Sequence, residues 1–141
     1  MSILKLTKGM ISERISEFIE IDKVINTDEK WQYDNFIIDL DGKWDNSYVF
    51  FIGSEIAGYI ICSVKNKENL HIHRFAIKQE YQKMGIGSKL INEVIKDADI
   101  YIKYLTLKVY KDNLIAKRFY EKNNFRNICL MNDNHIYRKD L

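Results

Sequence analysis

The stretch Gln82-Lys83-Met84-Gly85-Ile86-Gly87 is the most informative part of the sequence, because an apolar run from Leu70 to Ile77 precedes it and a helical pattern from Ile86 to Ala98 follows it. The order strand, glycine turn, helix is typical of a phosphate-binding loop. Glycines let the backbone approach a ligand closely, and the free N–H groups and dipole of a helix start attract anions. Two glycines would equally serve a tight, closely packed turn. The stretch therefore predicts a phosphate cradle or a packed turn, and motifs farther along the chain favour the first.

The composition fits one globular domain with a substantial core. The chain has 141 residues, of which 46% are hydrophobic, and a chain of this length buries roughly two-thirds of its unfolded surface. We therefore predict a single domain over residues 1–141. Its 22 Lys and Arg residues against 20 Asp and Glu residues give a net charge of +2, with the two signs interleaved. Because the positive and negative charges nearly cancel, the sequence predicts no nucleic-acid partner.

Neither a targeting signal nor a metal-binding pattern stands out. The first residues lack the apolar core of a signal peptide, and runs such as Tyr48–Ile52 are too short to cross a bilayer. We expect a cytoplasmic protein with no membrane partner. Cys62 and Cys129 each stand in an apolar, strand-like run without the spacing of a metal site. Two reduced, mostly buried thiols and no bound metal are therefore expected.

The spacing of apolar residues predicts the order of the elements. A strand is expected over Ile3–Thr7 and a helix around Ile11–Ile19. The capping residues Asn26-Thr27-Asp28 predict a second helix, which Asp41-Gly42 ends. The later elements are expected as strands Tyr48–Ile52, Glu55–Lys65 and Leu70–Ile77, helix Ile86–Ala98, strand Tyr104–Tyr110, helix Asn113–Asn123, and strands Phe125–Met131 and His135–Asp140.

These elements predict one mixed sheet. The three strands between Tyr48 and Ile77 have the short turns of an antiparallel meander. The strand, helix and strand from Leu70 to Tyr110 imply a crossover and a parallel pair. The fold class is therefore predicted as α/β (α+β), with a mostly antiparallel sheet of six to seven strands around a central parallel pair, flanked by about four helices.

A second motif follows the strand Tyr104–Tyr110. In Asn113-Leu114-Ile115-Ala116-Lys117-Arg118-Phe119-Tyr120, the residues Asn113, Ala116 and Tyr120 are spaced to share one helix face. That face carries a carboxamide, a small gap and a phenol. Taken alone, Asn113 fits an ordinary helix cap, and Tyr120 fits a core residue whose hydroxyl reaches the surface.

Together, the two motifs closely resemble the GCN5-related N-acetyltransferase (GNAT) superfamily. The family signature Gln/Arg-x-x-Gly-x-Gly/Ala is met by Gln82, Gly85 and Gly87, and the pattern Asn-x-x-Ala-x-x-x-Tyr-Glu is met by Asn113, Ala116, Tyr120 and Glu121. The resemblance covers Leu70 to Phe125 and departs at Asn124-Phe125, where the family commonly has Gly-Phe. Asn tolerates the left-handed backbone of such a turn. The resemblance implies a GNAT-like sheet whose parallel pair splays apart.

The resemblance also implies acetyl-CoA as the acyl-donor cosubstrate, lying between the two splayed strands. Backbone groups of the first strand would pair with the pantetheine arm and polarise the thioester oxygen. The pyrophosphate would rest on the glycine turn, and Asn113 would hold the cofactor near its reactive end. The implied cofactor-binding residues are Phe75, Ala76, Ile77, Gln82, Lys83, Met84, Gly85, Ile86, Gly87, Ser88, Asn113, Ala116 and Tyr120.

Acetylation of an amine requires two proton transfers. A primary ammonium has a pKa of about 10.4 and must lose a proton before it attacks, and the CoA thiol, with a pKa of about 8.5, leaves better protonated. Tyr120 suits the second step, because a phenol with a pKa of about 10 stays protonated at neutral pH. No covalent enzyme intermediate is expected, since neither cysteine stands in a motif.

The catalytic base is predicted on the strand before the glycine turn. Strict alternation would put His71, His73, Phe75 and Ile77 on one face, and several family members have Glu at the position of His71. His71 is therefore the predicted base, directly or through a water chain. In the N-terminal acetyltransferase branch a Glu on the next strand often serves, and Lys108 stands there. The alternatives to His71 are His73, Glu55, Asp112 and solvent.

Weaker signals mark the acceptor side. In this family the first two helices and their loops form the acceptor cleft, so Trp31 and Tyr33 are predicted to bind the substrate, unless they only pack the second helix on the sheet. Trp31 also loosely resembles an aromatic residue of the protein N-terminal acetyltransferases. An acidic cluster of Asp39, Asp41 and Asp45 could attract a cationic amine. Exposed edge strands are compatible with a homodimer.

The resemblance therefore implies an N-acetyltransferase that moves an acetyl group from acetyl-CoA to a primary amine by direct attack in a ternary complex. A protein N-terminus, a lysine side chain and a small amine all stay open as acceptors. The alternative is a non-catalytic acyl-CoA-binding or regulatory module with the same fold. A P-loop or dinucleotide-binding domain is disfavoured, because no Lys-Ser/Thr follows Gly87 and no third glycine completes that motif.

Overall fold

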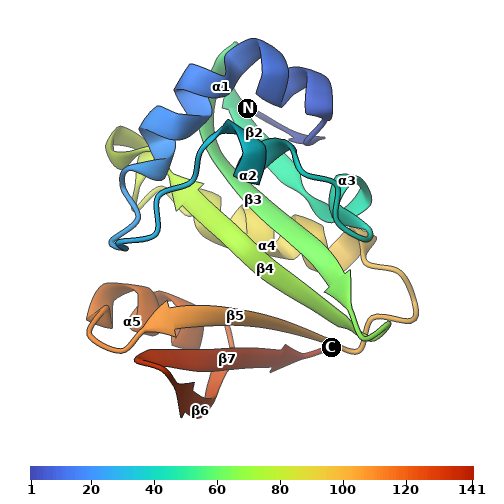
Figure 1. Cartoon of the computed structure of the whole chain (residues 1–141), viewed down its shortest axis with the longest axis vertical. Coiled ribbons are helices and arrows are strands. Elements are labelled where there is room, and N and C mark those ends of the chain that lie inside the picture. Colours follow the sequence, from blue (N-terminus) through green and yellow to red (C-terminus); the bar gives the residue numbers. More distant parts are fainter.

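The structure, a computed structural model, describes all residues 1–141 (Figure 1). The strands are β1 (Ser2–Lys5), β2 (Tyr48–Ile52), β3 (Glu55–Lys65), β4 (Asn69–Ile77), β5 (Tyr104–Tyr110), β6 (Arg126–Met131) and β7 (Asn134–Asp140). The helices are α1 (Lys8–Asp22), α2 (Tyr33–Ile37), α3 (Lys43–Asn46), α4 (Ile86–Asp97) and α5 (Leu114–Lys122), with a 3-10 turn at Gln79–Tyr81. None of these helices combines the length and apolar character that a membrane span requires.

All seven strands form one sheet in the order β1-β2-β3-β4-β5-β7-β6. Neighbouring strands are antiparallel except β4 and β5, which run parallel. Helix α4 connects these two strands, as a parallel pair requires a crossover. The predicted mixed sheet with one central parallel pair is confirmed.

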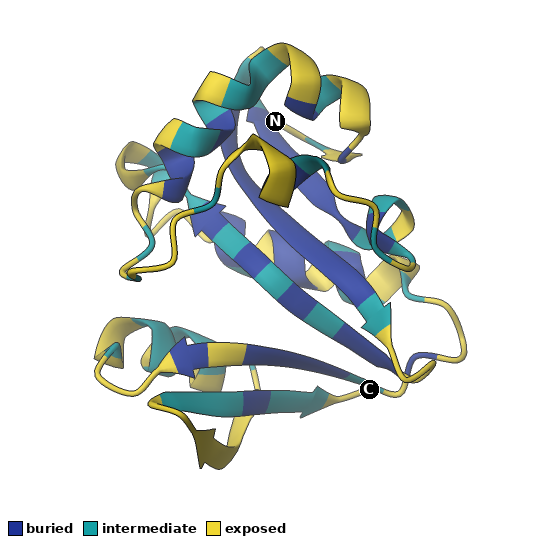
Figure 2. Ribbon diagram, in the orientation of Figure 1, coloured by how far each residue is buried: buried dark blue, intermediate teal, exposed yellow.

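Each face of the sheet has its own apolar core. On one face, α1 and α2 cover a cluster that includes Phe18, Phe36 and Tyr59, the α1-side core. On the other face, α4 contributes Leu90 and Val94 to a larger cluster, the α4-side core, against which residues of α5 also pack. Strands β2 and β3 lie between the two layers and are almost wholly buried (Figure 2).

The segment between α1 and β2 differs from the prediction. One helix is predicted after the caps Asn26-Thr27-Asp28, whereas the structure has the two short helices α2 and α3. The reason is Lys43, a fully buried lysine whose Nζ donates to the carbonyl oxygens of Phe36 at 2.6 Å and Ile38 at 2.7 Å. In a continuous helix the carbonyl of Phe36 would accept from the N–H of Leu40 instead.

The two cysteines have different surroundings. Cys62 is buried on β3, as predicted, but Cys129 is exposed on β6, so the prediction of a second buried thiol is wrong. Every residue of β6 is exposed, because this strand forms the edge of the sheet. An apolar stretch of sequence therefore does not distinguish an exposed edge strand from a buried strand.

Candidate active site

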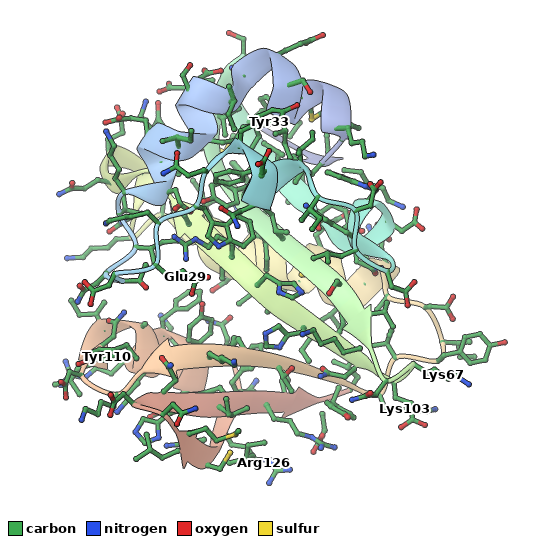
Figure 3. The ribbon with its side chains drawn as sticks, in the orientation of Figure 1. Glu29, Tyr33, Lys67, Lys103, Tyr110 and Arg126 are labelled. Atoms are coloured by element: carbon green, nitrogen blue, oxygen red, sulfur yellow. The ribbon has the colours of Figure 1, made fainter.

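The parallel strands β4 and β5 pair only at one end. Residues 69–71 of β4 pair with residues 104–106 of β5, and no pairing follows. β4 continues to Ile77 and β5 to Tyr110, so the strands diverge and leave a notch in the sheet (Figure 1). Lys67 lies at the closed end of the notch and Tyr110 at its open end (Figure 3). Backbone groups along the notch therefore lack a neighbouring strand.

A bulge in β4 lies beside the notch. Ile72 and Arg74 pair with the consecutive β3 residues 62 and 61, so His73 is an extra residue between them. The bulge shifts the alternation by one residue: Ile72 belongs to the α4-side core, whereas Arg74 bonds Asp22 at the end of α1. Bulges recur next to active sites, where they redirect a side chain.

The alternation predicted for β4 is therefore wrong beyond the bulge. His71 lies on the α1 side of the sheet, and the ring of His73 is next to it, with 4.8 Å between the ring centroids. Phe75 and Ile77 pack on the α4-side core instead. The two histidines thus border the notch from one face of the sheet, and Phe75 borders it from the other.

Phe75 and Ile77 present their backbone to the notch. The N–H of Lys78 donates to the carbonyl oxygen of Ala57 at 2.8 Å, and hydrogen-bonded pairs alternate along an antiparallel ladder. The N–H and C=O groups of Phe75 and Ile77 therefore point away from β3, to the side that β5 has left. The carbonyl oxygen of Ile77 accepts from Gln82 Nε2 at 3.0 Å, which ties the strand to the glycine turn.

The turn before α4 leaves a run of backbone amides unpaired. No N–H group from Lys83 to Ser88 has a hydrogen-bond partner in the protein, which makes six in succession, whereas a helix start ordinarily leaves about four. Lys83 and Gly85 have left-handed backbone, with φ of 66° and 78°, a feature of the nests that bind anions. The dipole of α4 adds attraction for negative charge. The turn has the geometry of a phosphate site.

The two glycines of the turn have different surroundings. A Cβ added at Gly85 would meet no atom within 4 Å, so Gly85 borders open space. A Cβ added at Gly87 would lie 2.9 Å from Phe119 Cζ and 3.3 Å from Phe75 Cζ. Gly87 therefore allows α4 to pack closely on α5 and β4, as a packed turn requires, whereas the open space beside Gly85 is what a phosphate cradle would need.

Tyr120 of α5 connects the two sides of the notch. Its ring contacts Phe75 on β4, with centroids 6.3 Å apart, and also Phe125 at 5.6 Å and Tyr137 of β7 at 6.4 Å. Burial, and to a smaller extent the Cys62 thiol, raises the pKa of the Tyr120 phenol above its usual value. Its hydroxyl has no protein partner and is not sealed from solvent. A protonated, unpartnered phenol can donate to a ligand in the notch.

Asn113 caps α5. Its Oδ1 accepts from the N–H of Ala116 at 3.1 Å, which satisfies one of the free donors of the helix start. Asn113, Ala116 and Tyr120 are half-buried, whereas Leu114 and Ile115 are exposed, so the first three share the inner face of α5. The side-chain nitrogen of Asn113 has no hydrogen bond within the protein.

His71 and His73 are held by hydroxyl groups. Nδ1 of His71 lies 2.7 Å from Thr106 Oγ1, and Nε2 of His73 lies 2.5 Å from Ser63 Oγ. Burial above all, together with nearby positive charge such as that of Lys65, lowers the pKa of His71 to about 3 and that of His73 to about 4. Both rings are therefore neutral at neutral pH and can accept a proton on one nitrogen.

Two of the acidic residues considered from the sequence are engaged in ion pairs. Glu55 accepts from Lys78 Nζ at 2.5 Å, and Asp39 accepts from Lys8 Nζ at 2.8 Å. Asp112 is exposed in the turn after β5. No group of three His, Cys, Asp or Glu side chains lies close enough together to hold a metal ion.

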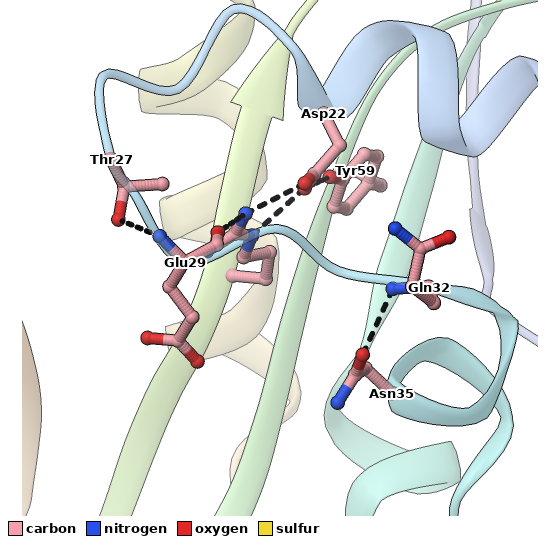
Figure 4. Close-up of polar contacts among 7 residues, drawn as sticks. Asp22, Thr27, Glu29, Gln32, Asn35 and Tyr59 are labelled. Atoms are coloured by element: carbon pink, nitrogen blue, oxygen red, sulfur yellow. Dashed lines mark hydrogen bonds and ion pairs between the residues drawn. The ribbon is translucent and has the colours of Figure 1, made fainter.

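A buried ion pair ties the loop after α1 to β4. Arg74 donates to both carboxylate oxygens of Asp22, at 2.8 and 2.6 Å, and to the carbonyl oxygen of Glu29 at 2.9 Å (Figure 4). The Tyr59 hydroxyl also donates to Asp22. The guanidinium lies 5.2 Å from the centre of the Trp31 ring. These contacts fix the loop next to the bulge of β4.

The two predicted acceptor residues lie apart. Trp31 lines a cavity of about 270 Å³ together with Lys30 and Arg74, between the end of α1 and β4. Tyr33 does not line that cavity; it is partly exposed at the start of α2, and its hydroxyl is 3.1 Å from Ser12 Oγ of α1 (Figure 3). The structure therefore places Trp31, but not Tyr33, beside the strand that carries the histidines.

Sequence reasoning missed several residues of this region. Thr106, which bonds both His71 and Asn69, follows no motif, and neither does Asn69. Asp22 and Arg74 are charged residues at buried positions of a helix and a strand. Because buried charges are normally paired, each of them could have been expected to have a partner of opposite charge. Their partnership could not be inferred, since they are far apart in the sequence.

Comparison with known proteins places this arrangement in a family. The model of the Acetyltransferase (GNAT) family matches residues 10–125. An uncharacterized N-acetyltransferase of Methanocaldococcus jannaschii is 32% identical over 89 residues, which are 60% of this chain and 54% of that protein. The chain thus matches about half the length of this curated relative.

Solved structures share the fold over nearly the whole chain. Ard1 from Thermoplasma volcanium superposes with a TM-score of 0.79 at 20% identity, over 99% of this chain and 97% of the other. The paiA N-acetyltransferase from Thermoplasma acidophilum, solved in complex with coenzyme A, gives 0.78 at 20% identity, over 99% and 98%. The family match contains the glycine turn, both strands of the notch and α5. This chain therefore belongs to the GNAT acetyltransferase family.

Proposed function

We propose that this protein is an acetyl-CoA-dependent N-acetyltransferase that acts on a primary amine by direct attack in a ternary complex. The observation that carries the proposal is the run of six unpartnered amides from Lys83 to Ser88. Such a run suits the two phosphates of a pyrophosphate. Family membership, and the coenzyme A bound to the Thermoplasma acidophilum relative, support acetyl-CoA as the donor.

In the proposed complex, acetyl-CoA occupies the notch. Its pyrophosphate accepts from the turn amides, and its pantetheine arm lies along residues 75–77 of β4, where the N–H groups of Phe75 and Ile77 point to the notch. An N–H group there polarises the thioester oxygen as negative charge develops on it, without any reorganisation. Gln82 keeps the turn attached to this strand through Ile77, and Asn113 and Ala116 of α5 form the opposite wall.

The acceptor approaches from the α1 side, where the histidines lie. Nε2 of His71 takes a proton from the ammonium, directly or through water. The neutral amine then attacks the carbonyl carbon, a C–N bond forms, the nitrogen releases its second proton to solvent and the C–S bond breaks. Tyr120 gives its hydroxyl proton to the departing sulfur and regains one from solvent. The two proton transfers thus occur on opposite faces of the sheet, which the notch connects.

The surroundings of His71 favour an acceptor of low pKa. A ring that holds a proton weakly is poorly matched to a lysine ammonium, with a pKa of about 10.4, and better matched to an α-amino group, at about 7.7–8.0. Lys65 and Lys108 add positive charge near His71, which disfavours polycationic acceptors. We therefore take the α-amino group of a peptide or protein as the acceptor class, with Trp31 as a contact for its first residues.

Replacing the proton donor tests the proposal. In Tyr120→Phe, kcat should fall by about 100-fold or more, as expected on loss of a general acid, while the dissociation constant of CoA stays within about twofold. The assay follows CoA thiol release from acetyl-CoA with a panel of peptide α-amines, lysine side chains and small amines. Tyr101→Phe is the matched control, because Tyr101 is 70% exposed and lies outside the notch.

Two results would contradict parts of the proposal. Unchanged turnover in Tyr120→Phe would remove that residue from the mechanism. Tight binding of CoA by the wild-type protein, without thiol release for any amine in the panel, would favour the non-catalytic acyl-CoA-binding module instead.

A further inference from the structure

A chain of three side chains lies at the closed end of the notch. Thr106 Oγ1 donates to Asn69 Oδ1 at 3.0 Å and lies 2.7 Å from His71 Nδ1. Thr106 is 6% and Asn69 9% exposed, so solvent does not compete for these contacts. His71 and Thr106 also form the last residue pair before β4 and β5 part. The chain therefore joins the two strands at the point where the notch begins.

The direction of these hydrogen bonds follows from the amide oxygen of Asn69, which faces Thr106 and can only accept. A hydroxyl group has a single proton, and Thr106 donates it to Asn69, so Thr106 can only accept from His71. Nδ1 of His71 must then carry the ring proton, and the neutral ring has its lone pair on Nε2. No side chain or backbone group of the protein is bonded to Nε2. The only basic atom of the ring is thus left for another molecule.

The neighbouring histidine provides a contrast. Nε2 of His73 lies 2.5 Å from Ser63 Oγ, but the Ser63 hydroxyl has no third partner that would orient its proton. Either tautomer of His73 satisfies this contact. Only His71 has both an oriented hydroxyl and a free nitrogen, although the two rings lie side by side.

We propose that Thr106 and Asn69 are positioning residues that hold His71 in the tautomer with a free lone pair on Nε2. The inference rests on the proposed function, in which this nitrogen takes the proton of the acceptor amine. A group that served only to satisfy buried polar atoms would need no particular proton direction. Here, if the hydrogen bonds ran in the opposite direction, the ring proton of His71 would be on Nε2. Its lone pair would then be on Nδ1, where Thr106 blocks it.

The tautomer can be measured in the unliganded protein. Long-range 1H–15N spectra distinguish a ring protonated on Nδ1 from one protonated on Nε2, and the chain has only three histidines. His71→Gln identifies the His71 signals by their disappearance. At neutral pH we expect Nδ1–H for His71. A predominant Nε2–H form would overturn the proposal.

Two pairs of variants test the role of each positioning residue. Thr106→Val removes the acceptor for Nδ1–H and should shift the ring toward Nε2–H and lower kcat by about tenfold or more, with the KM for acetyl-CoA within about twofold. Thr106→Ser, which keeps the hydroxyl, should have the wild-type tautomer and the wild-type kcat. Asn69→Ala frees the Thr106 proton to point at His71, so a mixture of tautomers is expected, whereas Asn69→Asp keeps an acceptor and the Nδ1–H form.

The outcomes separate this inference from the proposed function. If Thr106→Val lowered only the melting temperature and left the tautomer and kcat unchanged, the hydrogen bonds of Thr106 would have only a structural role. If the wild-type protein shows no turnover with any amine, the proposed function fails, and the spectra of the wild type and of Asn69→Ala still decide whether the chain orients the ring.

Discussion

At the residue scale, His71 and His73 are two histidines held uncharged. Burial is the main cause, and it lowers their pKa to about 3 and about 4, against about 6.5 in an unfolded chain. Between those values and about pH 6.5, the unfolded chain binds protons that the folded protein does not. Unfolding is therefore favoured as the pH falls through this window.

Stability should accordingly decrease from about pH 6.5 to about pH 4, and His73 should account for part of the slope. His73→Gln removes one of the two groups, so its free energy of unfolding should fall less steeply with acidification than that of the wild type. Urea unfolding at several pH values measures the slopes. Above about pH 7 the two curves should run parallel, and equal slopes below pH 6 would show that His73 is not held neutral.

Among single residues, the sequence identified the candidate site residues that belong to a motif and missed those that belong to none. Tyr120 and Asn113 occupy the inner face of α5 as their spacing predicts, but whether they act on a ligand stays a prediction. Thr106 could not have been chosen, because a lone threonine in a strand has no pattern. Its importance follows from register, which pairs it with His71, and register depends on contacts across the sheet.

At the element scale, the turn into α4 allows a controlled test of the phosphate cradle. Gly85 and Gly53 both have left-handed backbone, with φ of 78° and 60°, and a Cβ on either would meet no atom within 4 Å. Replacing either by alanine should therefore cost a similar free energy of unfolding, about 1–2 kcal/mol. Only Gly85→Ala should also weaken CoA binding, since Gly53 lies in the β2–β3 turn.

Calorimetric titration with CoA, and thermal unfolding of both variants, measure the two effects. Equal CoA affinity for Gly85→Ala and Gly53→Ala would mean that the left-handed turn is not part of the binding site. Gly87→Ala differs from both, because it forces Phe119 to move and so acts through packing.

The ion pair between Arg74 and Asp22 supports a second prediction about elements. The two side chains are 7% and 6% exposed, and removal of one partner from a buried pair costs about 3–5 kcal/mol. Arg74→Met should therefore lower the free energy of unfolding by that amount and loosen the loop after α1. Lys8→Met, which breaks the exposed pair with Asp39, should have little effect, as surface pairs contribute little. A similar small change in both variants, measured by urea unfolding, would refute this.

The elements themselves were largely predictable from their periodicity. Strand Tyr104–Tyr110 and strand Glu55–Lys65 have the predicted bounds, because alternation over a long run leaves little freedom in assignment. The helix expected before β2 fails because Lys43, a residue outside it, binds its carbonyl groups. The bulge in β4 has no sequence signal either, since it arises from pairing with β3.

At the scale of the whole molecule, the sheet consists of two parts joined over three residue pairs. Strands β1 to β4 form one part and β5, β7 and β6 the other, with the notch between them. The first part contributes His71 and the turn amides, and the second contributes Thr106 and Tyr120. The proposed site is therefore complete only when both parts of the sheet pack together. The pattern of apolar residues predicted that β4 and β5 are parallel, and only the resemblance to the family predicted that they splay apart.

The most direct test is an amide 1H–15N NMR titration with CoA, with pantetheine, which lacks the pyrophosphate, as the control. If the turn binds the pyrophosphate, the amide signals of Lys83 to Ser88 should shift most with CoA and hardly at all with pantetheine. Absence of any shift with CoA, or shifts confined to residues outside the turn and the notch, would contradict the account.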